Sequence, residues 1–144
     1  DGLLFLPYGC MVDHFQHIIY DNPDLTPAER HDVWKDLEEQ YQPFIKYDDD
    51  HPFHAGGGAW MKKDHIFTTP FYYIDYCLAH ICALQLWDES RTDMRSALDK
   101  YNRLCAAGGT GTFLELIKDA GLESPFDVKV IKKLAFSVCD FLNL

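Results

Sequence analysis

The sequence KDHIFTTPFYYIDY, residues 63–76, decides the fold of the chain because it contains the signals that begin a long helix. Thr69 or Thr68 can cap this helix, and Pro70 suits its first position because an N–H there would need no intrahelical partner. An apolar run follows the proline. We therefore expect a helix over residues 71–90 that is buried on most of its sides.

The same stretch gathers hydroxyl groups and an imidazole at the expected helix start. Tyr72 and Tyr76 are four residues apart and should share one face of the helix, whereas Tyr73 points elsewhere. Together with His65, they can donate hydrogen bonds to an oxygen that gains negative charge during a reaction. The alternative is a core helix whose tyrosines only pack, and the spacing alone favours it because aromatic stripes usually belong to cores.

Helical patterns cover most of the remaining chain. Capping boxes at Thr26–Glu29 and Ser124–Asp127 mark two helix starts, and glycines mark helix ends. Strand signals are absent apart from an ambiguous apolar run at residues 3–6. We therefore predict an all-α fold, a helical bundle that forms a single domain or subdomain over residues 1–144. The other expected helices cover residues 7–20, 26–42, 92–107, 112–120 and 124–142, and a long loop covers 43–69.

Composition disfavours several classes of protein. A net charge of −10 on 144 residues argues against nucleic acid binding, because phosphate contacts need a basic surface. The 47% share of hydrophobic residues is enough for a core, and no apolar run reaches the length of a membrane span. Part of the acidic charge lies in an exposed-looking patch at residues 48–50, which resembles a calcium loop only superficially.

The cysteines number five, without a Cys-x-x-Cys pair. An odd count without such spacing argues against a disulfide scaffold and against a zinc knuckle. Each cysteine lies in an apolar helical context, so we expect buried free thiols in a reducing cytoplasm. Their positions are Cys10, Cys77, Cys82, Cys105 and Cys139.

Sequence blocks over nearly the whole chain form a recognisable pattern. They are DNP at 21–23, TPAER at 26–30, GGAW at 57–60, HIF at 65–67, PFYYIDY at 70–76, GG at 108–109, FLEL at 113–116 and AGLESPF at 120–126. Together these blocks resemble the oligoendopeptidase F family, zinc endopeptidases of the thimet-oligopeptidase-like group that cleave short peptides. The resemblance implies the C-terminal portion of a zincin-like catalytic domain.

The resemblance also implies roles for single residues. His65 matches a histidine that steadies the substrate carbonyl or the tetrahedral intermediate. Tyr76, followed by Tyr73 and Tyr72, matches tyrosines that donate to the oxyanion. Asp64 stands where the family usually has glycine, and its carboxylate would favour a protonated imidazole at the neighbouring histidine.

The glycine-rich block is the second part of the implied site. Gly57, Gly58 and Trp60 are implied to bind substrate, since glycine lets a loop close over a peptide backbone. The alternative for the glycines is a simple reversal of the chain.

No His-Glu-x-x-His motif occurs in the sequence, although a zincin needs two histidines one turn apart with a glutamate between them. The resemblance therefore implies that zinc is bound in a larger parent protein and by no ligands within this segment. We expect the segment alone to be inactive. Its expected partners are oligopeptide substrates and the N-terminal part of the same protein.

Three alternatives remain open at this point. His14 and His17 lie three residues apart and could bind a metal if further ligands joined them. The chain could instead be a non-catalytic helical module, derived from the peptidase, that binds a peptide or a partner. A domain separated from its partner also exposes apolar surface and could self-associate.

Overall fold

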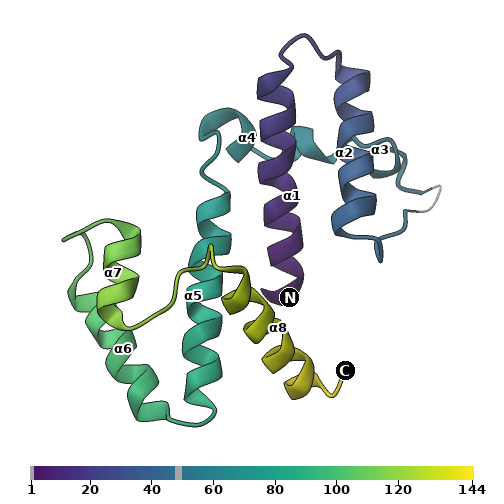
Figure 1. The fold of residues 1–144 in the computed structure, drawn as a ribbon. Helices are drawn as coiled ribbons and strands as arrows, with labels where there is room; N and C mark the ends of the chain where they lie inside the picture. Colours follow the sequence, from purple (N-terminus) through teal and green to yellow (C-terminus); the bar gives the residue numbers. More distant parts are fainter. Residues whose placement is uncertain (1, 48–49) are drawn as a thin grey trace. The chain divides into compact units, whose positions relative to one another are not determined.

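The structure, a computed structural model, describes residues 2–47 and 50–144, which form helices joined by turns and loops, with no strand among them (Figure 1). The predicted all-α class is confirmed. The helices are α1 (Gly2–Asp21), α2 (Pro27–Tyr41), α3 (Pro52–Ala55), the 3-10 helix η1 (Gly58–Lys62), α4 (His65–Thr68), α5 (Ile74–Ser90), α6 (Met94–Ala106), α7 (Phe113–Ala120) and α8 (Val128–Leu142). Contacts divide the chain into two compact units, Asp1–Cys77 and Leu78–Leu144, which are described separately.

An antiparallel pair of helices, α1 and α2, forms the body of the first unit (Figure 1). The predicted capping box begins α2: the Glu29 N–H donates to the Thr26 hydroxyl at 3.3 Å, and the Thr26 N–H donates to the Glu29 carboxylate at 2.7 Å. The fully buried ring of Trp34 meets Phe15 edge-on, with centroids 5.1 Å apart. The core of this unit contains Met11, Val12, Phe15, Ile19, Trp34, Leu37, Trp60, Ile66 and Tyr73.

Helix α1 begins at Gly2 rather than at Pro7, and it includes the ambiguous apolar run at residues 3–6. Pro7 lacks the N–H that would bond to the Leu3 carbonyl, which costs the helix one hydrogen bond near its end. Packing of the apolar face outweighs this local loss, because most helix stability in a protein comes from such packing.

The expectation of an uninterrupted loop over residues 43–69 is wrong. The short helices α3, η1 and α4 lie within it, and each is too short to give a periodic apolar pattern. Gly57 joins two of them in the left-handed region, with a φ of 77°. A Cβ at this position would lie only 2.3 Å from the His31 carbonyl oxygen, so the backbone of α2 leaves room for glycine alone.

The predicted start of α5 is also wrong, because Pro70 does not occupy a first helical position. The helix begins at Ile74, and Phe71 adopts a left-handed conformation with a φ of 63°. The Tyr72 N–H donates to the Thr69 carbonyl at 3.2 Å, which closes a turn. The Phe71 N–H donates to the side-chain Oε1 of Gln16 at 2.8 Å. A tertiary hydrogen bond from α1 therefore overrides the local capping signal.

The second unit has a smaller core. It contains Cys82, Ile117 and Leu122, with Leu86 and Leu104 packed against them. Helix α5 contributes to this core from one side only, since Ala79 and Ala83 are exposed, so the expectation that it is buried on most sides is wrong.

Capping defines the other helix starts of the second unit. Glu115 completes a capping box by accepting the Thr112 N–H at 2.9 Å. The capping box predicted at Ser124 is absent. Instead Asp127 caps α8 by accepting the Lys129 N–H at 2.8 Å, and α8 begins at Val128. Asp93 acts in the same way, because it caps α6 by accepting the Ser96 N–H at 2.9 Å.

The cysteines differ in exposure more than the sequence predicted. All five are free thiols, but only Cys77 and Cys82 are buried. Cys10 is half-buried, and Cys105 and Cys139 are exposed because they lie on outer faces of α6 and α8. The expectation of five buried thiols is therefore wrong for three of them.

Within the described part of the chain, we find no helix with both the length and the apolar character required to cross a membrane.

Candidate functional site

Four aromatic side chains that the sequence singled out come together in the first unit. The His65 ring lies 4.9 Å from the Tyr73 ring and 5.8 Å from the Tyr76 ring, measured between centroids. Tyr76 lies 5.5 Å from Tyr73 and 5.3 Å from Tyr72. All four pairs are edge-to-face, with interplanar angles between 70° and 85°. We call these four residues the His65 cluster.

Exposure divides the tyrosines of the His65 cluster. Tyr72 is 47% exposed and Tyr76 is 42% exposed, so both can meet a ligand. Tyr73 is 7% exposed and belongs to the core of the first unit. His65 is half-buried between them. The packing interpretation therefore describes Tyr73, whereas Tyr72 and Tyr76 form the open side of the cluster.

Lys63 supports the cluster from the buried side, and sequence reasoning did not assign it a role. Its Nζ donates to the Tyr73 hydroxyl at 3.3 Å and lies 4.8 Å from the centroid of that ring. It also lies 5.0 Å from the centroid of Tyr8. Burial lowers the pKa of Lys63, but the hydroxyls of Tyr8 and Tyr73 outweigh it, so the pKa lies above its ordinary value. The ammonium ion is therefore charged at neutral pH.

The Lys63 contact has a consequence for the Tyr73 hydroxyl. Because the ammonium group donates to the phenol oxygen, the hydroxyl hydrogen is free to be donated elsewhere. The exposed Tyr76 is also a donor at neutral pH. Burial against its neighbours and the adjacent Tyr72 raise the pKa of Tyr76 above its ordinary value.

Helix α1 fixes the backbone that bears the cluster. The Tyr20 hydroxyl donates to the Ile66 carbonyl at 3.1 Å, and Gln16 accepts the Phe71 N–H. The Phe71 ring packs against Tyr20 at 5.2 Å and against His17 at 4.9 Å. These contacts join residues about fifty positions apart, and no local pattern in the sequence announces them.

The three residues implied to bind substrate lie deeper than the exposed tyrosines. Gly57 and Gly58 are buried, and a Cβ on Gly58 would meet the Phe53 ring at 2.7 Å. Trp60 is 5% exposed, and its ring lies 5.5 Å from that of Phe15. It also lies 5.9 Å from the Phe67 ring, through which it contacts α4. Asp64, at the residue before α4, is exposed beside His65.

The described residues contain no group of three or more His, Cys, Asp or Glu side chains that could hold a metal ion. His14 Nδ1 instead lies 3.1 Å from the Tyr41 hydroxyl, and His17 Nε2 lies 3.4 Å from an oxygen of Asp13. The donor set in this part of the chain therefore does not fit a zinc ion. The acidic patch at residues 48–50 falls largely outside the described residues.

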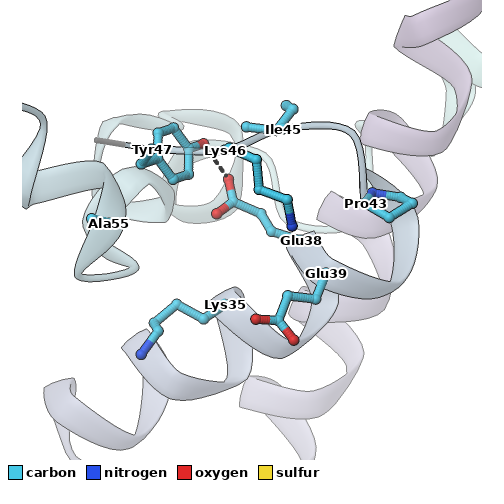
Figure 2. Close-up of a pocket in the computed structure, with 8 residues that line it drawn as sticks. All are labelled: Lys35, Glu38, Glu39, Pro43, Ile45, Lys46, Tyr47 and Ala55. Atoms are coloured by element: carbon cyan, nitrogen blue, oxygen red, sulfur yellow. Dashed lines mark hydrogen bonds between the residues drawn. The ribbon is translucent and has the colours of Figure 1, made fainter. Parts of the chain in front are cut away.

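A cavity of about 470 Å³ lies beside α2 (Figure 2), and its described lining does not include the His65 cluster. Figure 2 shows Lys35 and Lys46 among its lining side chains, and the Tyr47 hydroxyl donates to Glu38 Oε1 at 2.9 Å. Burial, together with this carboxylate, raises the pKa of Tyr47 to about 12. The cavity is lined by side chains of both charges, and Tyr47 and Glu38 are already hydrogen-bonded to each other.

Comparison with solved structures gives three strong matches. A structure described as an oligoendopeptidase F is 47% identical, with a TM-score of 0.93, and the match covers 99% of this chain and 25% of that one. PZ peptidase A, solved with an inhibitor, is 45% identical, with a TM-score of 0.93 and the same coverage of both chains. A structure described as an oligoendopeptidase F from Bacillus anthracis str. Ames is 39% identical, with a TM-score of 0.77, and the match covers 99% of this chain and 22% of that one.

The chain thus spans about a quarter of the length of the solved structures that it matches. The comparison with curated proteins found no match. A family model, described as peptidase family M3, matches residues 2–136, which is nearly the whole chain. This coverage and the identity of 47% to an oligoendopeptidase F confirm the predicted relationship. The chain belongs to peptidase family M3.

Proposed function

We propose that this chain is the C-terminal part of the catalytic region of a zinc-dependent oligoendopeptidase that hydrolyses short peptides. Its role is to supply one wall of the substrate site and the donors that stabilise the oxyanion. The observation that carries the proposal is the His65 cluster, in which an imidazole and two exposed phenols converge on a family M3 chain. Oligopeptides and the rest of the same protein are its proposed partners.

Each member of the cluster has a distinct task in this proposal. His65 and Tyr76 donate hydrogen bonds to the carbonyl oxygen of the scissile bond as that oxygen gains negative charge. Tyr72 lies beside Tyr76 and can bind the adjacent backbone of the peptide. Tyr73 packs edge-to-face against the imidazole on its buried side, and Lys63 donates a hydrogen bond to the Tyr73 hydroxyl. Donors that are placed before the reaction avoid the cost of reorganisation, which is why a rigid cluster favours catalysis.

Zinc in the parent protein would polarise the carbonyl and activate a water molecule. The described residues of this chain do not offer a fitting set of ligands, so the proposed ligands lie elsewhere in the parent protein. The contribution of this chain is then confined to hydrogen bonding, orientation and exclusion of water. The chain on its own is expected to be inactive.

Turnover of a fluorogenic peptide by the whole protein tests the proposal. We expect His65→Gln and Tyr76→Phe each to lower kcat roughly 10²–10³-fold, since each removes one oxyanion donor, with little change in KM. Tyr101→Phe is the matched control, because Tyr101 is an exposed tyrosine of the second unit. If Tyr76→Phe retains the activity of Tyr101→Phe, Tyr76 is not an oxyanion donor.

The second candidate is a non-catalytic module that binds a peptide. It is favoured by the exposed aromatic surface of the first unit, which includes Phe67 at 56%, Tyr72 at 47% and Phe71 at 40% exposure. Calorimetry of the whole protein with an uncleaved peptide, together with the turnover assay, separates the two candidates. Binding that is lost in Phe71→Asn, without any turnover by the unsubstituted protein, would favour the binding module.

A further inference from the structure

Cys77 occupies an unusually confined position at the start of α5. It is 1% exposed, and its Sγ lies 3.8 Å from the Leu6 carbonyl oxygen of α1. The same sulfur would be 2.2 Å from a Cβ at Gly9. A glycine at position 9 therefore lets the sulfur of Cys77 rest directly on the backbone of α1, inside the first unit.

Cys10 directly follows Gly9, so it lies on the stretch of α1 that the Cys77 sulfur contacts, and the two thiols shift each other's pKa. Cys10 is half-buried, so one thiol of the pair can be reached from solvent while the other is enclosed. The two residues are sixty-seven positions apart in sequence, and no Cys-x-x-Cys spacing marks them. A solvent-accessible thiol that contacts a buried second thiol is the arrangement found in thiol–disulfide exchange sites.

The two thiols divide the chemistry between them. Interaction with the Cys77 thiol lowers the pKa of Cys10 to about 7, which favours the thiolate form of Cys10. Interaction with the Cys10 thiol, followed by burial, raises the pKa of Cys77.

We propose that Cys10 and Cys77 form a reversible thiol–disulfide site for low-molecular-weight disulfides such as oxidised glutathione. The Cys10 thiolate attacks one sulfur of the small disulfide, forms a mixed disulfide and releases one thiolate. Cys77 then attacks the sulfur of Cys10, and its proton goes to the second thiolate as that thiolate leaves. Two protein thiols and one small disulfide thus give one protein disulfide and two small thiols.

The resulting bond would join α1 to the first turn of α5. Cys77 directly follows Tyr76 and lies four residues after Tyr73, so the bond would tie the start of α5, which bears Tyr76 and directly follows Tyr73. The proposal itself concerns only the two sulfurs. It does not depend on the proposed peptidase function, so failure of one does not contradict the other.

The other three cysteines serve as internal controls. Cys105 and Cys139 are exposed, and Cys82 is buried, with a pKa raised by burial. In the full chain treated with oxidised glutathione, we expect Cys105 and Cys139 to end as glutathione adducts. Cys10 and Cys77 should end as a disulfide with each other that dithiothreitol reverses. Alkylation of the remaining thiols, proteolysis and tandem mass spectrometry identify each product and distinguish Cys77 from Cys82.

A Cys77→Ala variant tests the resolving step. We expect it to accumulate the glutathione adduct at Cys10, at least tenfold above the amount in the unsubstituted chain. A persistent adduct at Cys10 beside a free Cys77 in the unsubstituted chain would overturn the proposal. So would a Cys10 that stays unmodified while Cys105 and Cys139 react. These readouts use the unsubstituted chain, so the proposal can be refuted even if the variant does not fold.

Discussion

Gly9 allows α1 to approach the first turn of α5, and its replacement by alanine tests this contact quantitatively. A Cβ at position 9 would lie 2.2 Å from Cys77 Sγ. This distance is about 1.2 Å short of the closest ordinary van der Waals contact. Overpacking of this kind costs about 1–3 kcal/mol, whereas alanine is favoured over glycine inside a helix by about 1 kcal/mol. We therefore expect Gly9→Ala to lower the free energy of unfolding by up to about 2 kcal/mol.

The substitution Cys77→Ala separates these two effects. In that background the sulfur is absent, so Gly9→Ala should instead raise the free energy of unfolding by about 1 kcal/mol through helix propensity. The sign of the effect thus reverses between the two backgrounds. The double-mutant cycle should give a coupling energy of about 1–3 kcal/mol between positions 9 and 77.

Urea denaturation followed by tryptophan fluorescence measures the four free energies of the cycle. All four proteins should contain Trp87→Phe, because Trp87 belongs to the second unit. Trp34 and Trp60, both buried in the first unit, then report on that unit alone. If Gly9→Ala has the same effect with and without Cys77, the sulfur does not rest against Gly9 and the packing argument fails.

Three further predictions follow from hydrogen bonds in the same structure. Gln16→Leu leaves the Phe71 N–H without its acceptor and should lower the free energy of unfolding by about 1–3 kcal/mol, measured by urea denaturation. Lys63→Met keeps the aliphatic stem but removes the ammonium group that binds the Tyr73 hydroxyl. In the whole protein it should lower kcat while changing the melting temperature little. Hydrogen bonds from Thr26 and Thr112 lower the pKa of Glu29 and of Glu115, so their stabilisation is complete above the unfolded pKa and is lost as pH falls through the folded value. Melting temperatures of the double variant Glu29→Gln, Glu115→Gln should therefore depend less steeply on pH below about 4.

The start of α2 depends on neighbouring residues and was predictable from the sequence, whereas the start of α5 follows a turn that a distant residue holds and was not. The capping box of Thr26 and Glu29 needs only a four-residue pattern, and the structure has it as predicted. A capping box was also predicted at Ser124, but it does not form, and Asp127, three residues later, caps α8 instead. A local pattern therefore indicates where a helix can start, but it does not decide which of the possible capping residues is used.

Phe71 shows most clearly why part of the candidate site escaped prediction. A left-handed phenylalanine is sterically unfavourable, and nothing in the proline-containing stretch indicates one. The hydrogen bond from Phe71 to Gln16 and the packing of its ring on Tyr20 stabilise this conformation from α1. The strain is local, but the groups that compensate for it are some fifty residues away. A reader of the sequence could find the cluster members but not the contacts that hold them.

Burial separates the tyrosines of the cluster: Tyr73 packs in the core, whereas Tyr72 and Tyr76 are exposed and are the ones for which we propose contact with a ligand. Tyr73 is buried, meets His65 edge-on and receives the Lys63 ammonium, so its role is to support the imidazole. Tyr76 is exposed and in edge contact with the same imidazole, so its hydroxyl can reach a ligand. Adjacent helical positions differ by about 100° in direction, which explains why spacing grouped Tyr72 with Tyr76 and separated Tyr73. Spacing could not show which face is open, because that depends on where α1 packs. In the site that we propose, the buried Tyr73 is therefore the support that holds the exposed Tyr76 in place.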